Sequence, residues 1–425
     1  MISRISKMNA VDDILENLPI ETKKELVDLF EKIHFTSSQK LEIVKDEADL
    51  HQWKEKPFVS LLSLDEVQSK DGRSGERYMK KLRDHMLTLR REETDYSSFF
   101  PKRKQHPKTK ATVDDSAILI GRCPCPVDGE KTRCCKLRTL DAVQQCSFGC
   151  AYCSVGAFYN KNEIRVVDNL SKRLDDIELD SDIWHIGTGQ ASDSLLWGDD
   201  FGTLSALSDF ANKHKDIIIE LKSKSKRDVF DRKYPKNMVF TWSLNAPTII
   251  EKEEHLTAKL EERLECAERA RDNNNLVGFH IHPMVYFKGW QDEYREVVRE
   301  IEKRFSPDDI MMISIGTLTF TKAVLKRLRE EGEESRVLEM ELTPAAGKFS
   351  YPLDIKKKMF SHVYSSFSKD FKDNIFFYMC MEDPSLWQPV LNRSYQSDKD
   401  FEEDMKRHYF AKINNKSYGQ FKQNQ

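Results

Sequence analysis

The sequence lacks the features that would place it in a membrane or outside the cell. It has no apolar run of roughly 20 residues, the length that a membrane-spanning helix needs, and no secretory signal at its start. Its net charge is only −3, so any nucleic-acid-binding site must be a local patch. No internal repeat or low-complexity tract stands out. We therefore expect a cytoplasmic protein, whose thiols stay reduced.

The chain has enough apolar residues for a sizeable core. Hydrophobic residues make up 39% of its 425 residues, and charged residues make up 33%. This length and composition suit one large domain, or a main domain with extensions, under a heavily solvated surface.

The cysteines are few but strongly clustered. The chain has nine, and seven of them fall between positions 123 and 153. In a long intracellular chain such clustering indicates metal binding rather than a disulfide framework, and the odd total argues against complete pairing. The clustered residues are Cys123, Cys125, Cys134, Cys135, Cys146, Cys150 and Cys153.

Three regions are expected along the chain. Residues 1–112 form a charged, glycine-poor helical region that ends in a basic linker with two prolines, residues 101–110. Residues 113–390 form the main domain, with a cysteine-rich entry segment. Residues 391–425 form a polar C-terminal tail.

Within the main domain, short β-branched runs alternate with charged helical stretches, which predicts a parallel sheet with right-handed crossovers. Five or six such units suit a full or partial βα barrel, whose ligands lie at the carboxyl ends of its strands. The predicted strands are 140–144, 183–187, 217–221, 239–244, 277–282, 313–318 and 375–380, and the predicted helices are 257–271, 292–305 and 321–331. The fold class is thus α/β with a helical N-terminal extension.

One cysteine run carries specific chemistry. In Cys146-Ser-Phe-Gly-Cys150-Ala-Tyr-Cys153, three thiolates can each bind one iron of a [4Fe-4S] cluster and leave the fourth iron open. An open iron suits a chelating cosubstrate. The spacing, with Tyr152 before the last cysteine, is typical of radical S-adenosylmethionine (SAM) enzymes. The alternative is a zinc site that borrows a fourth thiolate such as Cys135.

Four downstream motifs follow predicted strands in a fixed order. They are Trp184-His-Ile-Gly-Thr-Gly-Gln-Ala-Ser-Asp193, Glu220-Leu-Lys-Ser-Lys224, Trp242-Ser-Leu-Asn245 and Val277-Gly-Phe-His-Ile-His-Pro-Met-Val-Tyr286. Their order over roughly residues 135–390 resembles the spore photoproduct lyase family of radical SAM enzymes. The segments 347–352 and 378–382 are similar to its wider, non-sporulating branch. The resemblance implies a partial (βα)6-type radical SAM barrel.

The resemblance also implies roles for single residues. Cys146, Cys150 and Cys153 would hold the [4Fe-4S] cluster. The SAM contacts would be Tyr152, Gly187, Thr188, Gly189, Lys222 and Ser243. Glycine permits close backbone approach, a lysine can pair with a carboxylate, and a serine can hydrogen-bond it or the ribose. An ordinary turn or a solvated lysine would explain some of these residues equally well.

The sequence departs from the family at one position. Spore photoproduct lyases have a cysteine three residues before the aspartate of the first motif, and that cysteine returns a hydrogen atom to the product radical. Gln190 stands there in this chain and has no weak S–H bond. The candidate catalytic donors that remain are Cys380 and Tyr286, although Cys380 also fits a buried strand cysteine.

The upstream cysteines exceed the family pattern. Cys123, Cys125, Cys134 and Cys135 can hold a second iron–sulfur cluster or a zinc ion, and the sequence does not separate these from thiols without a metal.

The resemblance implies a carbon–carbon lyase that repairs pyrimidine photoproducts in DNA, with a reducing electron donor such as flavodoxin or ferredoxin. Basic stretches at 102–110 and 222–236 suit phosphate contacts, although charge runs are usually solvated faces. Two alternatives remain: a radical SAM enzyme acting on RNA or a small metabolite, and a zinc-stabilised nucleic-acid-binding protein. The oligomeric state stays open.

Overall fold

The computed structural model describes residues 10–68, 72–102, 110–114, 119–123, 132–155 and 163–414. The chain divides into two compact units, each described here by itself. The first contains residues 1–104 and 323–341, and the second contains residues 105–322 and 342–425. No helix within the described ranges is long and apolar enough to cross a membrane.

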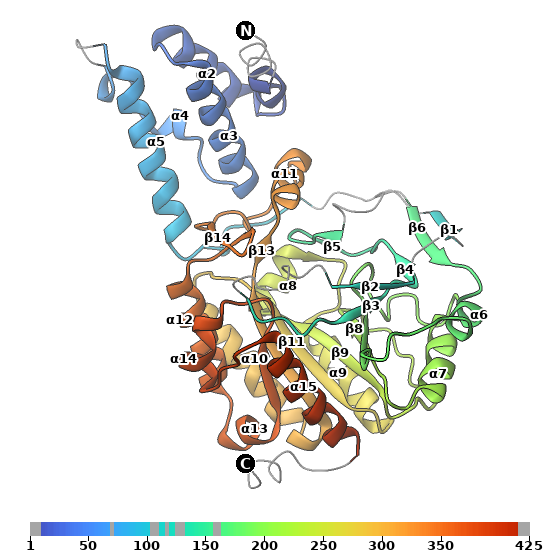
Figure 1. The fold of residues 1–425 in the computed structure, drawn as a ribbon. Coiled ribbons are helices and arrows are strands. Elements are labelled where there is room, and N and C mark those ends of the chain that lie inside the picture. The colour runs from blue at the N-terminus through green and yellow to red at the C-terminus, as the bar shows by residue number, and fades with distance from the viewer. Residues whose placement is uncertain are drawn as a thin grey trace. The chain divides into compact units, whose positions relative to one another are not determined.

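The first unit is helical (Figure 1). Its elements are α2 (Ile20–Lys32), α3 (Ser37–Trp53), α4 (Phe58–Leu61), η1 (Leu64–Glu66), α5 (Ser74–Arg91) and nearly all of α11 (Lys322–Glu331). Buried Asp49 of α3 pairs with Arg90 of α5 at 3.1 Å and with Arg329 of α11 at 3.0 Å. These ion pairs join α11 to the N-terminal helices, whereas its position in the sequence suggested a helix of the barrel repeat.

An eight-stranded sheet forms the centre of the second unit and curls into a partial barrel. Neighbouring strands are parallel except for the antiparallel pair β2–β3. In their order across the sheet the strands are β16 (Phe376–Met379), β12 (Ile310–Thr317), β11 (Val277–Met284), β9 (Met238–Leu244), β8 (Ile218–Ser223), β7 (His185–Thr188), β3 (Arg138–Leu140) and β2 (Ile120–Arg122). The predicted α/β partial barrel with N-terminal helices is confirmed.

Three smaller sheets accompany the barrel. Their strands are β1 (Lys110–Asp114), β6 (Glu163–Val167) and β4 (Val143–Gln144); β10 (Glu254–His255) and β5 (Gly149–Cys150); and β13 (Thr319–Phe320), β15 (Lys348–Ser350) and β14 (Thr343–Ala345). The prediction of one strand over 140–144 was wrong, because β3 ends at Leu140 and Val143 pairs with β6 in another sheet. A turn between them redirects the chain toward the cysteine run.

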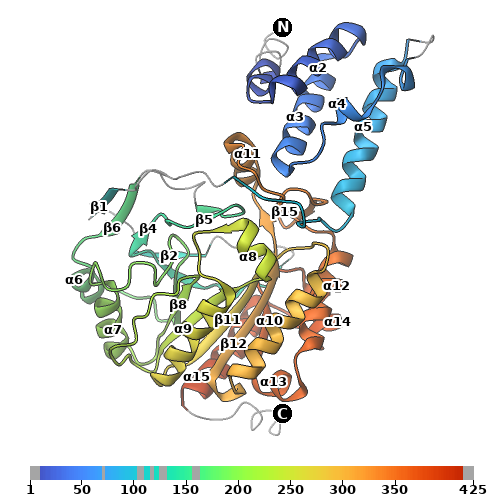
Figure 2. The same ribbon diagram turned by 180° about the vertical axis from the view of Figure 1, so that it is seen from behind.

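Helices cover the outer face of the barrel sheet. They are α6 (Leu170–Asp175), α7 (Thr203–Lys213), α8 (Pro247–Glu253), α9 (Leu260–Asp272), α10 (Trp290–Arg304), α12 (Leu353–Ser366), α13 (Lys369–Asn374) and α14 (Trp387–Leu391), with short turns η3 (Pro307–Asp309) and η4 (Pro384–Leu386). Figure 2 shows α9 and α10 over this side of the sheet. Aromatic rings pack between the sheet and these helices. The ring centroid of Phe279 in β11 lies 5.1 Å from that of Phe305 after α10, and the centroid of Phe377 in β16 lies 5.2 Å from that of Tyr364 in α12.

The opposite, concave face is polar. Side chains alternate between the faces of a strand, so residues two apart share a face. Glu220 of β8 reaches His185 of β7 at 2.9 Å and His280 of β11 at 2.8 Å, and His280 reaches Ser314 of β12 at 2.6 Å. Because Glu220 spans β9 to reach β11, these groups must lie on the inner side of the curl. The interior of the barrel is therefore a network of hydrogen bonds.

A C-terminal helix closes one end of that interior. Residues 398–413 form α15 (Asp398–Ile413), although this stretch was expected to belong to a polar tail. Phe401, Met405 and Tyr409 are buried, and the Tyr409 ring lies 5.5 Å from that of His185 at the start of β7. Their spacing of four residues places them on one face of the helix, and His408 is buried beside them with its ring 5.0 Å from that of Phe376.

Candidate active site

The three cysteines of the C-x3-C-x2-C run lie on a loop that is fastened from two sides. Cys150 is in β5 and is paired, antiparallel, with Glu254 of β10. The Ala151 amide donates to the Glu253 carbonyl at 2.8 Å, and the Ser192 hydroxyl donates to the Gln145 carbonyl at 2.9 Å. All three cysteines are partly exposed. We call Cys146, Cys150 and Cys153 the loop cysteines.

Burial and neighbouring groups favour the protonated form of two of these thiols. Desolvation, together with Glu254 and Cys153, raises the pKa of the Cys150 thiol to about 12 although Lys224 opposes the shift. Desolvation, Asp193 and Cys153 raise the pKa of Cys146 in the same direction. Thiols that resist ionisation are weak nucleophiles, but a metal can replace their protons.

Among the described residues, no three or more His, Cys, Asp or Glu side chains are arranged around one metal ion. A four-iron cluster does not require such convergence, because each of its thiolates binds a different iron. The clustered thiols of the loop therefore fit that group.

A buried charge network stands behind the loop. Lys224, just after β8, places its Nζ 4.0 Å from the Cys150 Sγ, 2.5 Å from the Tyr152 hydroxyl and 2.9 Å from Glu254. The Tyr152 hydroxyl also donates to Glu254, and Arg263 of α9 pairs with Glu254 at 2.6 Å. Tyr152, predicted to contact SAM, thus has its hydroxyl engaged by protein groups.

The turn after β7 contains Gly187, Thr188 and Gly189. Gly189 has φ +87°, and a Cβ there would lie 2.6 Å from the Lys222 carbonyl oxygen. A Cβ at Gly187 would lie 2.8 Å from a methyl group of Leu137. Both glycines therefore pack against protein atoms, which explains their presence without a ligand. Their role toward SAM stays a prediction.

Asp193 holds this turn and the end of β8 together. Its carboxylate accepts hydrogen bonds from the Leu195 and Leu196 amides at 3.0 and 2.9 Å. It also accepts from the Ser223 hydroxyl at 2.8 Å and the Lys224 amide at 2.6 Å. Burial raises its pKa in spite of these bonds. Asp193 is thus a structural anchor beside Cys146.

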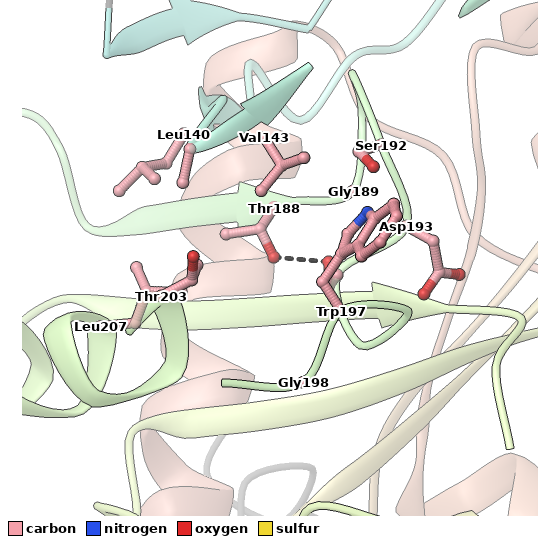
Figure 3. A pocket seen from close by; sticks show the side chains of 12 residues that line it. Leu140, Val143, Thr188, Gly189, Ser192, Asp193, Trp197, Gly198, Thr203 and Leu207 are labelled. Atoms are coloured by element: carbon pink, nitrogen blue, oxygen red, sulfur yellow. Dashed lines mark hydrogen bonds between the residues drawn. The ribbon is translucent and has the colours of Figure 1, made fainter. Parts of the chain in front are cut away.

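A small pocket adjoins the turn. Figure 3 shows Thr188, Gly189, Asp193 and Trp197 around it, with the Thr188 hydroxyl 2.6 Å from that of Ser194. Leu140, Val143, Thr203 and Leu207 line its remaining wall together with neighbouring residues. Lys222 and Ser243 do not line it, so this pocket is separate from the barrel interior.

Lys222, Ser243 and Cys380 belong to the interior. Strand register aligns Lys222 with Thr241 and Ser243 with His280, all on the concave face. The charge of Lys222 lowers the pKa of both His280 and His282, after burial as the main cause. It also acts on Cys380, whose pKa burial raises to about 12. Lys222 is therefore close to both histidines and to Cys380.

Glu220 is a buried carboxylate of this interior. Burial disfavours its charge, but hydrogen bonds from His185 and His280 hold its pKa well below the usual value. The Thr241 hydroxyl donates to it at 3.1 Å. A buried carboxylate with these partners keeps the interior polar and ordered.

Tyr286 lies elsewhere. It follows β11, accepts a hydrogen bond from Lys358 of α12 at 3.1 Å, and has its ring 6.0 Å from that of Trp290 in α10. Its amide donates to the Tyr351 hydroxyl at 3.0 Å. These contacts connect it to the outer helices α10 and α12.

Four other cysteines gather from distant parts of the chain. Cys123 follows β2 and Cys380 follows β16, the two outermost strands of the sheet. Cys134 hydrogen-bonds Cys135, and Cys135 is also within electrostatic reach of Cys380 and Cys123. The Arg133 amide donates to the Glu382 carbonyl at 3.3 Å. We call Cys123, Cys134, Cys135 and Cys380 the edge cysteines. Cys125 lies outside the described residues.

Sequence reasoning missed Glu254 and Arg263. Neither belongs to a motif, and both occur in stretches crowded with charged residues. Their side chains are 1% and 0% exposed. The sequence offered no sign that these two charges, among many, are buried.

The chain is similar to known proteins in sequence and in fold. A family model described as spore photoproduct lyase matches residues 144–378. A curated spore photoproduct lyase from Clostridium acetobutylicum is 23% identical over 198 residues, which is 45% of this chain. The match spans 59% of that relative's length.

A solved structure is similar in fold. It is a spore photoproduct lyase double variant with bound AdoMet and dinucleoside spore photoproduct, and it matches with a TM-score of 0.51 and 17% identity. The match covers 71% of this chain and 94% of that one. At this identity the likeness concerns the fold alone.

Proposed function

Because the chain belongs to the spore photoproduct lyase family, we propose that it is a radical SAM enzyme that repairs pyrimidine photoproducts in DNA. The observation that carries the proposal is the position of the loop cysteines. They lie beside Asp193 and Lys224, which follow the parallel strands β7 and β8, and βα barrels bind ligands at the carboxyl ends of their strands.

In this proposal the loop cysteines hold a [4Fe-4S] cluster and leave one iron for SAM. The bound groups supply one-electron cleavage of SAM to a 5′-deoxyadenosyl radical. Lys222 and Ser243 would orient SAM from the concave face, and the 187–189 turn and Tyr152 would border it. The electron donor would be a small reductant such as flavodoxin or ferredoxin.

Cys380 is the stronger of the two candidate hydrogen donors. It follows β16 at the carboxyl end of the barrel, near Lys222 of the interior, whereas Tyr286 contacts the outer helices. Burial keeps its thiol protonated, so an S–H bond is present. Transfer of that hydrogen atom to a product radical would leave a thiyl radical on Cys380, beside three further thiols. These thiols, with Cys125, remain the proposed site of a second cluster or zinc ion.

DNA as the substrate rests on the family rather than on surface charge. In the basic stretch 222–236, Lys226, Arg227 and Arg232 are paired with Glu262, Asp200 and Asp199. Cations that are already paired are poorer phosphate ligands. Together with Gln190 in place of the family's donor cysteine, this favours a second candidate, a radical SAM enzyme acting on RNA or a small metabolite.

The test is anaerobic reconstitution followed by reduction with SAM and ultraviolet-irradiated DNA. Lesion loss and 5′-deoxyadenosine formation are followed by mass spectrometry, with unirradiated DNA as the control. Loss of the lesion supports repair. SAM cleavage without lesion loss overturns the DNA substrate and leaves the second candidate. A colourless protein that binds zinc overturns both, and would indicate a zinc-stabilised nucleic-acid-binding protein.

A further inference from the structure

Lys224 is the cation next to the loop cysteines. Its ammonium group lies 4.0 Å from the Cys150 sulfur, and its side chain is only 15% exposed. It follows β8 directly, where the Lys224 amide is held by Asp193. A cation in a partly desolvated place interacts with a neighbouring charge more strongly than it would in water.

The lysine is held in position by its neighbours. Its ammonium donates to the Tyr152 hydroxyl at 2.5 Å and pairs with Glu254 at 2.9 Å. Glu254 in turn pairs with Arg263 at 2.6 Å and accepts a hydrogen bond from the side-chain amide of Asn245 at 3.0 Å. Glu254 is also paired with Cys150 through the backbone of the β5–β10 pair. The residue that binds the lysine is therefore fixed directly beside the cysteine.

The charges of this network do not balance. Lys224 and Arg263 are two cations, and Glu254 is the one carboxylate that both of them contact. Arg263 satisfies its other donors on the carbonyls of Ala258 and Ser243, which carry no charge. A buried net positive charge is costly unless an anion lies near it. The group that Lys224 faces on its remaining side is the Cys150 sulfur.

We propose that Lys224 sets the reduction potential of the cluster held by the loop cysteines. The inference rests on the proposed function, because it requires that cluster. Reduction adds one electron and hence one negative charge, which a fixed cation beside a ligand sulfur stabilises. Hydrogen bonds and charge around the sulfurs are established determinants of iron–sulfur potentials. Lys224 is a positioning and tuning residue and takes no part in bond making.

The experiment is a redox titration of the reconstituted full chain without SAM, followed by electron paramagnetic resonance of the reduced cluster. Lys224→Met removes the charge and keeps much of the length. Lys224→Arg keeps the charge, and Lys224→Gln keeps a donor without charge. Lys226→Met is the matched control, because Lys226 is two residues away, exposed, and paired with Glu262. Iron content is measured for every variant.

We expect Lys224→Met and Lys224→Gln to lower the equilibrium constant for reduction of the cluster at least tenfold. For a one-electron couple this is a fall of 59 mV in the reduction potential. Lys224→Arg should stay closer to the wild-type protein, and Lys226→Met should match it. If Lys224→Met fails to retain iron, Lys224→Gln gives the comparison, because it can still donate to Tyr152.

Other outcomes separate the two proposals. If the Met and Gln variants have the same cluster reduction potential as the wild-type protein, the role of Lys224 is overturned and the proposed function stays intact. Failure of both uncharged variants to bind iron, while Lys224→Arg binds it, would also overturn tuning and assign Lys224 to cluster assembly. A wild-type chain that assembles no iron–sulfur cluster overturns the proposed function itself.

Discussion

The loop cysteines and the edge cysteines gather in different ways. The loop cysteines are within eight consecutive residues, and the ammonium group of Lys224 lies 4.0 Å from the sulfur of Cys150. The edge cysteines come from three separate segments and influence one another, with Cys134, Cys380 and Cys123 all raising the pKa of Cys135. The thiols recognisable in sequence thus have a cation beside one of their sulfurs, whereas Cys135, in the group assembled by folding, interacts chiefly with other thiols.

This difference suggests different tasks. Thiols next to a cation suit a site that accumulates negative charge, as a reducible cluster does. Protonated thiols have S–H bonds that can serve hydrogen transfer. Alternatively, a metal ion can bind them and displace their protons. The predictions below test this division, from the largest expected effect to the smallest.

The sharpest test removes the loop cysteines. The triple variant with Cys146, Cys150 and Cys153 changed to Ala should lose SAM cleavage down to the background without protein, because no thiolate remains to hold the cluster. Cys266→Ala is the control, since Cys266 is buried in α9 and belongs to neither group. Formation of 5′-deoxyadenosine is measured by chromatography. Persistent cleavage in the triple variant would show that another site binds the cluster.

Removing one edge cysteine should separate two activities. In Cys380→Ala, SAM cleavage should continue, while the amount of lesion repaired per SAM cleaved should fall severely, because no hydrogen atom is returned to the product. The ratio of the two products is measured in one reaction. Tyr286→Phe decides between the candidates: a fall in the ratio there, with Cys380→Ala normal, would assign the donor to Tyr286.

The ion pair behind the loop should be important for folding. Arg263→Met leaves Glu254 buried without one of its two cationic partners, and breaking a buried pair costs about 3–5 kcal/mol. Arg269→Met, on the same helix and paired with Asp228 at the surface, should cost about 1 kcal/mol or less. Urea unfolding measures both. Equal destabilisation by the two changes would mean that the Glu254–Arg263 pair contributes no more than a surface pair.

Acid should weaken the docking of α15, the helix next to the edge cysteines. Burial is the main cause that lowers the pKa of His408 to about 4, so the folded state resists its protonation. The unfolded chain binds this proton near pH 6.5, and stability is therefore lost as pH falls from about 6.5 to about 4, by about 3 kcal/mol at most. In His408→Phe this part of the pH dependence of the unfolding free energy should vanish. An unchanged profile would assign it to other groups.

The smallest effect on SAM cleavage is expected at the edge. Cys134→Ser with Cys135→Ser should leave cleavage near the wild-type rate while lowering the content of any second metal. Iron and zinc per chain are determined by elemental analysis, with about four irons expected for the loop site alone. Loss of SAM cleavage together with all iron would mean that the two groups of cysteines are one site.

Much of the architecture was predictable because it depends on local periodicity. Runs such as 239–244 and 277–282 are short and rich in β-branched and aromatic residues, and they became β9 and β11, each with one end shifted by a residue or two. The first strand was misplaced because Leu140, Ala142 and Val143 make 140–144 look like one short strand, and only the pairing of Val143 with β6 separates it from β3. The helix at 322–331 was predictable as a helix but not as a partner of α3, since that depends on its ion pair with Asp49.

The sequence by itself determined the loop cysteines and the order of the strand-end motifs. These are short-range patterns, in which the spacing of a few residues carries the information. Only the tertiary structure decided that Cys380 joins Cys123, Cys134 and Cys135, and that Lys224 faces Cys150. The reason is physical: whether a charge or a thiol is buried, and beside what, depends on segments that are far apart in the chain and meet only when the sheet curls.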